Sequence, residues 1–442
     1  MTSNTYSALW TAPVAAAQIH ATVKLPGSKS LTNRELVLSA LANKPTTLVE
    51  PLLSRDSKLM IGALEALGAR FSVEDDHIMV SPIPQATRPT DYSDDPNEVI
   101  EINCGLAGTV MRFVPPLAGL HLGRIRFDGD EAARRRPMAT TIRSLRELGV
   151  FVFQDYADEG KLPFTVVGDG HIEGGELTID ASESSQFVSG LLLSAARFNT
   201  GLTLTHSGEH LPSMPHIDMT IDCLEKRGVK ASKIGEATWR VESGIIAGGT
   251  VVIEPDLSNA GPFLAAAMVA GGSITIPHWP TATTQVGNEF EGILTRMGAK
   301  VVRDERGLTL TSDGSIHGID IDLSIGGELA PVVAALAALA DSPSRLRGIA
   351  HLRGHETDRL AALTAEINRA GGNCVETEDG LEIQPSELNG CVWQTYEDHR
   401  MATAGAIIGL RVAGIEVENI ATTSKTMPNF SELWLDMLGV SA

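Results

Sequence analysis

Residues 25–35 read Leu-Pro-Gly-Ser-Lys-Ser-Leu-Thr-Asn-Arg-Glu, a flexible glycine-serine turn followed by the start of a helix. Thr32 and Glu35 have the spacing of a capping box just before the apolar run at 36–38. This pattern predicts a capped helix start, with Arg34 in the first helical turn. The stretch also supplies an ammonium, a hydroxyl and a guanidinium from Lys29, Ser30 and Arg34. Beside free helix amides, such groups are suited to hold a phosphate or a carboxylate.

The pattern of this stretch recurs along the chain. A polar or glycine-rich start opens an apolar helix, and a turn then leads into a β-branched strand. The starts are about 70 to 77 residues apart, which is typical of supersecondary repeats. The six copies span residues 30–49, 107–127, 184–204, 258–276, 328–346 and 398–417.

A second helix follows each copy, usually ending at a glycine, and short strands come after it. The unit therefore has the order β-α-β-α-β-β. The sixth copy stops after its second helix at 430–438, and residues 19–25 are the candidates for its missing strands. The simplest division is three units per domain, with residues 1–25 and 256–442 in one domain and 26–255 in the other.

Composition restricts the function. With a net charge of −20, the chain lacks the broad basic face that nucleic-acid binding needs, and an anionic membrane is equally disfavoured. A small anionic ligand remains possible, because an acidic protein can contain a local cationic site. Four scattered cysteines disfavour a metal centre and a disulfide framework. No lysine or arginine precedes Lys24, and the longest apolar run is too short for a bilayer, so we expect a cytoplasmic protein without a membrane partner.

Groups suited to anions recur at the helix starts. The further candidates are Gly108, Arg112, Arg134, Arg135, Arg136, Ser184, Ser185, Gln186, His355, Glu356, Arg359, Asp398, His399, Arg400 and Lys425. Each has an ordinary structural interpretation: the arginine triplet could be a solvated face, the serine pair a helix cap, and the Asp-His-Arg run a salt-bridged cap. The stretch His-Glu-Thr-Asp-Arg lacks the second histidine of a zinc motif. Repetition at equivalent positions favours ligand binding, because parallel helices would direct their N-termini towards a single interdomain cleft.

Seven motifs together resemble the 5-enolpyruvylshikimate-3-phosphate synthase family. In chain order they are LPGSKSLTNR, GLAGTVMRF, ARRRP, SSQF, RGHETDRL, DHRM and SKT, and the resemblance runs from about residue 23 to 430. It implies an α/β (α+β) fold, a two-domain inside-out α/β barrel with three βαβαββ units per domain and a two-strand hinge. The active site of that fold lies in the cleft between the domains.

The resemblance implies transfer of the enolpyruvyl group of phosphoenolpyruvate to the 5-hydroxyl of 3-phosphoshikimate, in the pathway to chorismate and the aromatic amino acids. The reaction is an addition followed by an elimination, through a tetrahedral ketal phosphate. No metal or organic cofactor is implied. The family also suggests a monomer, and its phosphoenolpyruvate-site inhibitor is glyphosate.

Residue roles are carried over motif by motif. The 3-phosphoshikimate site comprises Lys29, Ser30, Arg34, Ser184, Ser185, Gln186, Ser213, Glu328 and His355. The phosphoenolpyruvate site comprises Lys29, Gly108, Arg136, Gln186, Arg359, Arg400 and Lys425. Glu328 is expected to accept the 5-hydroxyl proton and Glu356 to protonate the methylene carbon, with Lys29 or His355 assisting.

The sequence departs from the family at several of these positions. Many members have aspartate in place of Glu328 and lysine in place of His355. The extra methylene of Glu328 changes the reach of the carboxylate, and a histidine titrates closer to neutrality than a lysine. Two alternatives remain. One is the enolpyruvyl transferase of UDP-N-acetylglucosamine, whose loop cysteine is missing from residues 128–137; the other is a non-catalytic anion-binding protein, which the two glutamates disfavour.

Overall fold

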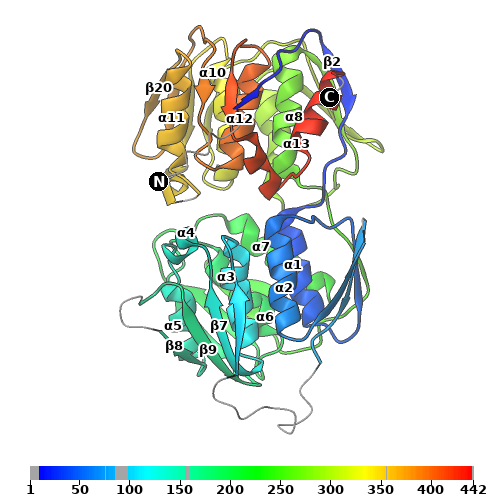
Figure 1. Ribbon diagram of the computed structural model, residues 1–442, viewed down its shortest axis with the longest axis vertical. Coiled ribbons are helices and arrows are strands. Elements are labelled where there is room, and N and C mark those ends of the chain that lie inside the picture. The colour runs from blue at the N-terminus through cyan, green and yellow to red at the C-terminus, as the bar shows by residue number, and fades with distance from the viewer. Residues whose placement is uncertain (1–8, 75, 85–97, 155–158, 355, 441–442) are drawn as a thin grey trace, which may run out of the picture. The chain divides into compact units, whose positions relative to one another are not determined.

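The computed structural model describes residues 9–74, 76–84, 98–154, 159–354 and 356–440. The chain divides into two compact units, which Figure 1 shows. Unit 1 contains Met1–Pro26 and Glu254–Ala442, and unit 2 contains Gly27–Ile253. The two connecting segments lie side by side, since the amide of Asp256 donates to the carbonyl of Pro26 at 2.9 Å.

Unit 2 contains three four-stranded sheets. Its strands are β3 (Thr46–Val49), β4 (Arg70–Val73), β5 (His77–Ser81), β6 (Val99–Asn103), β7 (Leu122–Asp128), β8 (Phe151–Phe153), β9 (Phe164–Asp169), β10 (Gly175–Ile179), β11 (Leu202–His206), β12 (Ala231–Gly235), β13 (Thr238–Val241) and β14 (Thr250–Val252). Its helices are α1 (Lys29–Ala40), α2 (Arg55–Ala66), α3 (Gly108–Ala118), α4 (Glu131–Arg134), α5 (Ala139–Glu147), α6 (Gln186–Ala195) and α7 (Met214–Lys226). The sheets are ordered β14-β3-β5-β4, β6-β7-β9-β8 and β10-β11-β13-β12.

Unit 1 contains two four-stranded sheets and one three-stranded sheet. Its strands are β1 (Leu9–Thr11), β2 (Ile19–Thr22), β15 (Gly272–Ile276), β16 (Lys300–Asp304), β17 (Gly307–Ser312), β18 (Asp320–Asp322), β19 (Ser344–Arg347), β20 (Asn373–Glu376), β21 (Leu381–Gln384), β22 (Val392–Trp393) and β23 (Glu416–Glu418). Its helices are α8 (Leu257–Ala270), η3 (Val286–Glu289), α9 (Phe290–Arg296), η4 (Gly327–Leu329), α10 (Ala330–Ala338), η5 (Ala350–Gly354), α11 (Arg359–Arg369), α12 (His399–Gly409), η6 (Ile420–Lys425) and α13 (Phe430–Leu438).

Three of the sheets follow one plan, β6-β7-β9-β8, β10-β11-β13-β12 and β18-β19-β21-β20. In each, the first two strands are parallel and joined across a helix, and the last two form an antiparallel pair. Such a parallel pair needs a crossover, and the apolar helices α3, α6 and α10 supply it. The predicted mixed α/β fold with repeated βαβαββ units is thus confirmed.

The missing strand of the sixth repeat comes from the N-terminal segment, as predicted, but not from the predicted residues. Residues 9–11, as β1, complete the sixth sheet by pairing antiparallel with β23. The stretch predicted for this place forms β2 instead, which runs parallel to β15 in the sheet of the fourth repeat. Strand β14, which precedes the helix of that fourth repeat in sequence, pairs with β3 of unit 2. Strands β2 and β14 are nearest to the two segments that connect the units, and each pairs in the sheet where sequence order would place the other. The sequence order of the repeats cannot indicate this exchange.

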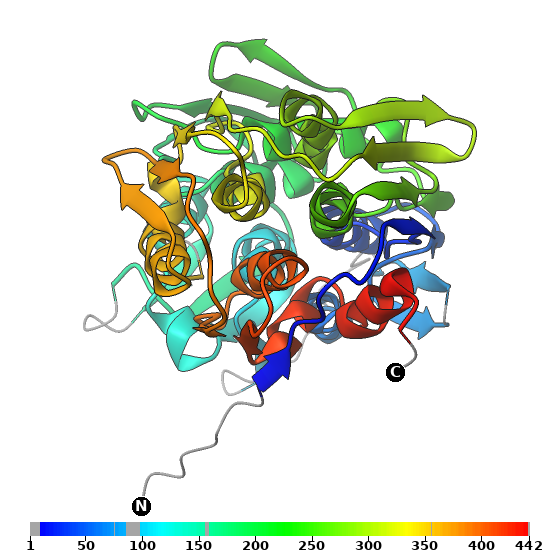
Figure 2. The same cartoon turned by 90° about the horizontal axis from the view of Figure 1, so that it is seen from above.

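The first helix of each repeat lies inside its unit. Helices α8, α10 and α12 pack against one another in unit 1, as do α1, α3 and α6 in unit 2. Figure 2 shows the unit 1 helices nearly end-on. Nine residues of α10, Ala330–Ala338, are all buried. A helix that is apolar on every side is stable only when other elements surround it, so the apolar repeats form the cores and the sheets lie outside them.

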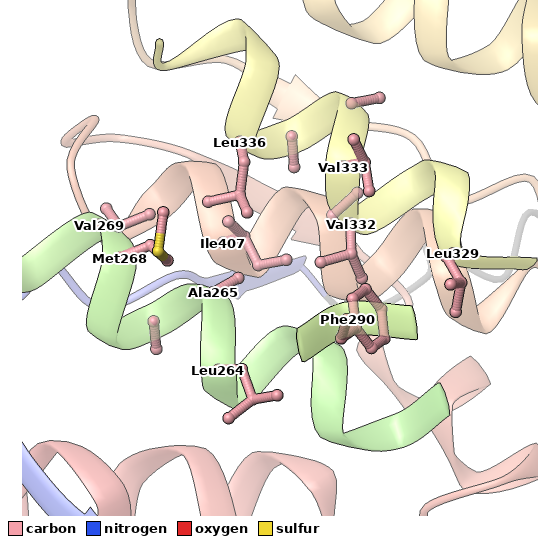
Figure 3. Packing of buried hydrophobic residues seen from close by; sticks show 14 of the residues in the cluster. Leu264, Ala265, Met268, Val269, Phe290, Leu329, Val332, Val333, Leu336 and Ile407 are labelled. Atoms are coloured by element: carbon pink, nitrogen blue, oxygen red, sulfur yellow. The ribbon is translucent and has the colours of Figure 1, made fainter. Parts of the chain in front are cut away.

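The unit 1 core depends on close helix contacts. Figure 3 shows Met268 of α8, Val332 and Leu336 of α10, and Ile407 of α12 within one cluster. A methyl at Gly261 would lie 2.4 Å from the Phe290 ring and 3.1 Å from Val332, so glycine permits this approach.

The predicted glycine stops are also confirmed. Gly68, Gly149, Gly228, Gly298 and Gly371 follow the second helices with φ between 78° and 113°, a conformation that favours glycine. In the described part of the chain, no helix has the length and apolar character needed to cross a membrane.

Candidate active site

Helix α1 begins at Lys29, with Ser28 as its N-cap. The Ser28 hydroxyl accepts from the amide of Leu31 at 3.4 Å. The predicted capping box is therefore wrong. The Thr32 hydroxyl instead accepts from the amide of Leu52, and Glu35 binds Arg227. Both side chains are buried, so tertiary contacts replace the local cap.

Lys29 is the first helical residue, and its side chain is 22% exposed. Its Nζ lies 3.8 Å from a carboxylate oxygen of Asp56 on α2. The ammonium thus stands at the positive end of a helix dipole, with one carboxylate nearby. This placement suits a lysine that binds an anion at the helix entrance.

Arg34 is in the second turn of α1, not the first, and is only 2% exposed. Its guanidinium donates to Thr220, Ser189 and the carbonyls of Ser30 and His216 at 2.8 to 3.3 Å. Burial lowers the pKa of Arg34 to about 10, and the group stays charged at neutral pH. Arg34 therefore ties α1 to α6 and α7, and four of its five N–H groups are used in doing so.

Gly108 opens α3, whose N-cap residue makes no side-chain cap. A Cβ atom at Gly108 would meet Gln186 Oε1 at 3.0 Å, Arg112 Nη1 at 3.1 Å and Arg136 Nη1 at 3.3 Å. Three residues predicted for phosphoenolpyruvate therefore meet at one point of unit 2: Gly108, Arg136 and Gln186. Uncapped helix amides beside two guanidinium groups form a strongly anion-attracting site.

Arg112 strengthens this cluster. Burial and the charge of Arg136 lower the pKa of Arg112 to about 9. Its Nε has no hydrogen-bond partner among the described residues, although Nη2 donates to the carbonyl of Pro137 at 3.2 Å. The sequence marked Arg112 as a candidate, but its role was not assigned. The other two arginines of the triplet have surface partners: Arg134 binds Asp128, and Arg135 binds Glu131.

The predicted serines lie at the entrances of α6 and α7. Ser184 accepts from the amide of Gln186 at 3.2 Å, and Ser185 is the N-cap of α6 without a side-chain cap bond. Ser213 is the N-cap of α7 and has a left-handed backbone, with φ 55°. At the α6 entrance Ser184 thus satisfies the first helix amide, while the α7 entrance has no side-chain cap bond from its N-cap residue.

Glu328 lies in η4, just before α10. Its Oε1 accepts from the hydroxyl of Ser258 at 2.7 Å and lies 3.9 Å from Arg400 Nη2. Arg400 also donates to the carbonyl of Glu328 at 2.9 Å. The carboxylate that was predicted as base is thus oriented by two groups of unit 1. Ser258 was not among the predicted site residues, although it opens the fourth repeat where Ser30 opens the first.

A second ionic cluster surrounds Arg359, which is 2% exposed. Its Nε donates to Asp398 at 2.7 Å and its Nη2 to Glu356 at 3.0 Å. Lys425 forms an ion pair with the other oxygen of Glu356. Unit 1 thus brings together Arg359, Lys425 and Glu356, while Arg400 is linked through Asp398, which accepts from the Arg400 amide at 2.8 Å. Asp398 is both the N-cap of α12 and part of an ion pair, which matches the salt-bridged cap interpretation.

The charges of this cluster shift its pKa values. Burial raises the pKa of Glu356, but Lys425 and Arg359 outweigh burial and hold it well below the usual value. Burial also raises the pKa of Asp398, and Arg359 lowers it to a net value below normal. Burial lowers the pKa of His399 well below its ordinary value, so the ring is neutral, and neither ring nitrogen has a hydrogen-bond partner among the described residues. His355, a predicted site residue, lies outside the described residues.

The lowered pKa of Asp398 predicts acid sensitivity of unit 1. A carboxyl group with a depressed folded-state pKa stabilises above its unfolded pKa of about 4, and this stabilisation is lost as the pH falls through the folded value. We expect Asp398→Asn to lower the free energy of unfolding at pH 7 and to lose less stability than wild type between pH 5 and 3. Chemical denaturation across this range tests the expectation. Glu382→Gln, in an exposed pair with Arg345 of the same unit, is the control. Parallel pH curves for wild type and Asp398→Asn would contradict the expectation.

Comparisons with known proteins show the family and the fold of the chain. The family model for EPSP synthase (3-phosphoshikimate 1-carboxyvinyltransferase) matches residues 14–434. A 3-phosphoshikimate 1-carboxyvinyltransferase of Kocuria rhizophila is 54% identical over 441 residues, covering 98% of this chain and 97% of the relative. Two structures of EPSP synthase from Acinetobacter baumannii, each 21% identical, share the fold with TM-scores of 0.82 and 0.78. They cover 98% and 95% of this chain, and 98% and 96% of their own.

The repeated fold and its anion-attracting helix entrances, taken with these matches, define a carboxyvinyl transferase. The matched family covers nearly the whole sequence, including every repeat. The chain belongs to the EPSP synthase family.

Proposed function

We propose that this chain transfers the enolpyruvyl group of phosphoenolpyruvate to the 5-hydroxyl of 3-phosphoshikimate and releases phosphate. The observation that carries the proposal is the 54% identity to a 3-phosphoshikimate 1-carboxyvinyltransferase over nearly both full lengths. Membership of the family gives the chain carboxyvinyltransferase activity in shikimate-pathway biosynthesis of aromatic amino acids. The exact acceptor atom and the residue roles are our assignments.

The cluster at Gly108 supports a role in binding phosphoenolpyruvate. This substrate has a phosphate and a carboxylate, so its site must neutralise several negative charges. We assign it to Lys29, Gly108, Arg136, Gln186, Arg359, Arg400 and Lys425. Arg112 joins them as a buried cation near Arg136.

The helix entrances of unit 2 support a role in binding 3-phosphoshikimate. We assign this substrate to Lys29, Ser30, Arg34, Ser184, Ser185, Gln186, Ser213, Glu328 and His355. Four of the five N–H groups of Arg34 donate to protein acceptors, and we assign the fifth to the substrate. The four hydrogen bonds hold the guanidinium in a fixed orientation. The hydroxyls at the α6 and α7 entrances supply neutral donors.

Glu328 is the base of the proposed reaction. It takes the proton from the 5-hydroxyl as the oxygen attacks C2 of phosphoenolpyruvate, while C3 gains a proton. Loss of a C3 proton then expels phosphate from the ketal, which forms the C2–C3 double bond of the enol ether product. Since Ser258 and Arg400 orient its carboxylate, Glu328 needs positioning more than a large pKa shift.

Glu356 must be protonated before it can donate the C3 proton, so its contacts with Lys425 and Arg359 must first weaken. Lys425 and Arg359 keep Glu356 ionised here, through their depression of its pKa. An incoming phosphate that binds these two cations would draw them away from the carboxylate and raise the pKa of Glu356. Substrate binding thus prepares the acid, with Lys29 or His355 assisting.

Gly108→Ala is expected to raise the KM for phosphoenolpyruvate at least about tenfold while the protein stays folded. The added methyl would stand 3.0 to 3.3 Å from Gln186, Arg112 and Arg136, whose flexible ends can shift but would fill the ligand space. Steady-state kinetics test this, and the inhibition curve of glyphosate, our proposed inhibitor of the same site, should shift in the same direction. Gly62→Ala is the control, because no atom lies within 4 Å of that methyl. Equal KM values in the two variants would contradict the assignment.

Phosphate release tests the whole proposal. We expect release from phosphoenolpyruvate only with 3-phosphoshikimate as the acceptor. Release with UDP-N-acetylglucosamine would identify the other transferase, and binding without release would leave an anion-binding protein. We also propose a cytoplasmic monomer, which fractionation and sedimentation can check.

Lys29→Ala is expected to lower turnover about 100-fold or more, since the ammonium would contact both substrates. The same phosphate-release assay measures it. Lys230→Ala, which removes an exposed lysine paired with Glu242, should leave turnover unchanged. Normal turnover of Lys29→Ala would remove that residue from the site.

A further inference from the structure

A buried histidine lies beside the loops that carry the serines of unit 2. His206 is the last residue of β11, is 7% exposed and pairs with Ile179 at the end of parallel strand β10. Its Nδ1 accepts from the backbone amide of Ala181 at 3.1 Å. No motif in the sequence marked this residue.

The contact fixes the protonation state of the ring. A backbone amide can only donate, so Nδ1 carries the lone pair and Nε2 carries the proton. Nε2 is buried and has no hydrogen-bond partner among the described residues. The nearby Asp180 carboxylate accepts instead from the amide and hydroxyl of Ser182, at 2.9 and 2.6 Å. The ring is thus a neutral acceptor for Ala181.

His206 contacts two loops at once. The first, residues 180–185, runs from β10 to α6. Within it the backbone amide of Ser184 donates to the carbonyl of Ala181 at 3.0 Å. The second, residues 207–213, runs from β11 to α7 and ends at Ser213. A Cβ at Gly208 in this second loop would stand 2.6 Å from Cε1 of the ring. The ring therefore bonds to one loop and packs against the other.

We propose that His206 is a positioning residue for 3-phosphoshikimate, which holds the 180–185 and 207–213 loops at the spacing that lets Ser184, Ser185 and Ser213 bind one ligand. This inference rests on the proposed function. It does not require the ring to touch the substrate. A shift of about 1 Å in such a loop is enough to impair binding, which is why a single backbone bond matters here.

The experiment compares two replacements of His206. His206→Asn places an amide oxygen where Nδ1 stood and can accept from Ala181, whereas His206→Leu cannot. We expect His206→Leu to raise the KM for 3-phosphoshikimate about tenfold, with a smaller change in the KM for phosphoenolpyruvate, and His206→Asn to recover most of the loss. Thr205→Val is the control, because it removes the Thr205–Thr238 hydroxyl contact from the same strand without touching either loop.

The outcomes separate the inference from the proposed function. A wild-type protein without phosphate release would overturn the function itself. An active wild type with unchanged kinetics in His206→Leu, or with equal losses in His206→Leu and His206→Asn, would overturn the positioning role. If His206→Leu does not fold, long-range ¹H–¹⁵N spectra of the wild type decide, with His206→Asn identifying the signal. A proton on Nε2 supports the inference, and a proton on Nδ1 overturns it.

Discussion

Glu328→Gln is expected to lower kcat by about 10²- to 10⁴-fold while both substrates still bind. The amide has the shape of the carboxylate and keeps a carbonyl oxygen for the Ser258 hydroxyl, which now donates to Oε1 at 2.7 Å. It cannot accept the 5-hydroxyl proton at neutral pH, so the attack on phosphoenolpyruvate loses its base. Single-turnover phosphate release measures the chemical step, and titration with 3-phosphoshikimate measures binding.

Glu291→Gln is the control for this substitution. Glu291 is 40% exposed and pairs with Arg303 on the surface of the same unit, so its neutralisation should not alter turnover. Unchanged kcat in Glu328→Gln would exclude Glu328 as the base. A large rise in the 3-phosphoshikimate dissociation constant with normal kcat would make it a binding residue alone.

Arg227→Met is expected to destabilise unit 2 by about 3–5 kcal/mol. Arg227 and Glu35 form an ion pair at 2.6 Å with side chains only 4% and 5% exposed. The guanidinium also donates to Ser39, Thr46 and the carbonyl of Ala247. Its loss leaves a buried carboxylate and several acceptors without their donor. Hydrogen exchange of peptides from α1 and α7 localises the effect, because a two-unit chain need not unfold in one step.

Two further variants make this prediction specific. Lys226→Met removes the neighbouring surface pair with Asp222 and should cost under about 1 kcal/mol. The double variant Glu35→Leu/Arg227→Met removes both buried charges and should recover much of the stability. A double variant as unstable as the sum of the two single variants would show that the buried charges are not coupled.

The sequence predicted the repeated fold because each repeat depends on local signals. Apolar helices, glycine stops such as Gly149 and β-branched strands follow from short-range chemistry, and their period shows directly in the chain. The gathering of Gly108, Arg136 and Gln186 was anticipated for a similar reason. All three stand at equivalent or nearby helix entrances, which the repeats bring to one end of a unit.

Other features depend on partners that are distant in sequence. Glu35 has the spacing of a cap, but Arg227 lies 192 residues away and outcompetes the local amides. The segment at 19–22 has a strand pattern that fits more than one sheet. Its partner, β15, is about 250 residues away in sequence, so no local signal identifies it. His206 shows no motif at all, because its role comes from a strand end and a loop brought together by folding. Local pattern gives the elements, and long-range packing decides which atoms each side chain meets.

The exchanged strands have a consequence for how the chain is made on the ribosome. Unit 2 has all its strands once β14 has emerged, before the helices of unit 1 are made. Strand β1 is made before all of unit 2, yet it must wait for β23 at 416–418 before it can pair. A strand made before the inserted unit therefore completes its sheet only after that unit. Translation imposes an order in which the inserted unit matures while the N-terminal strands stay unpaired, open to chaperones or to another nascent chain.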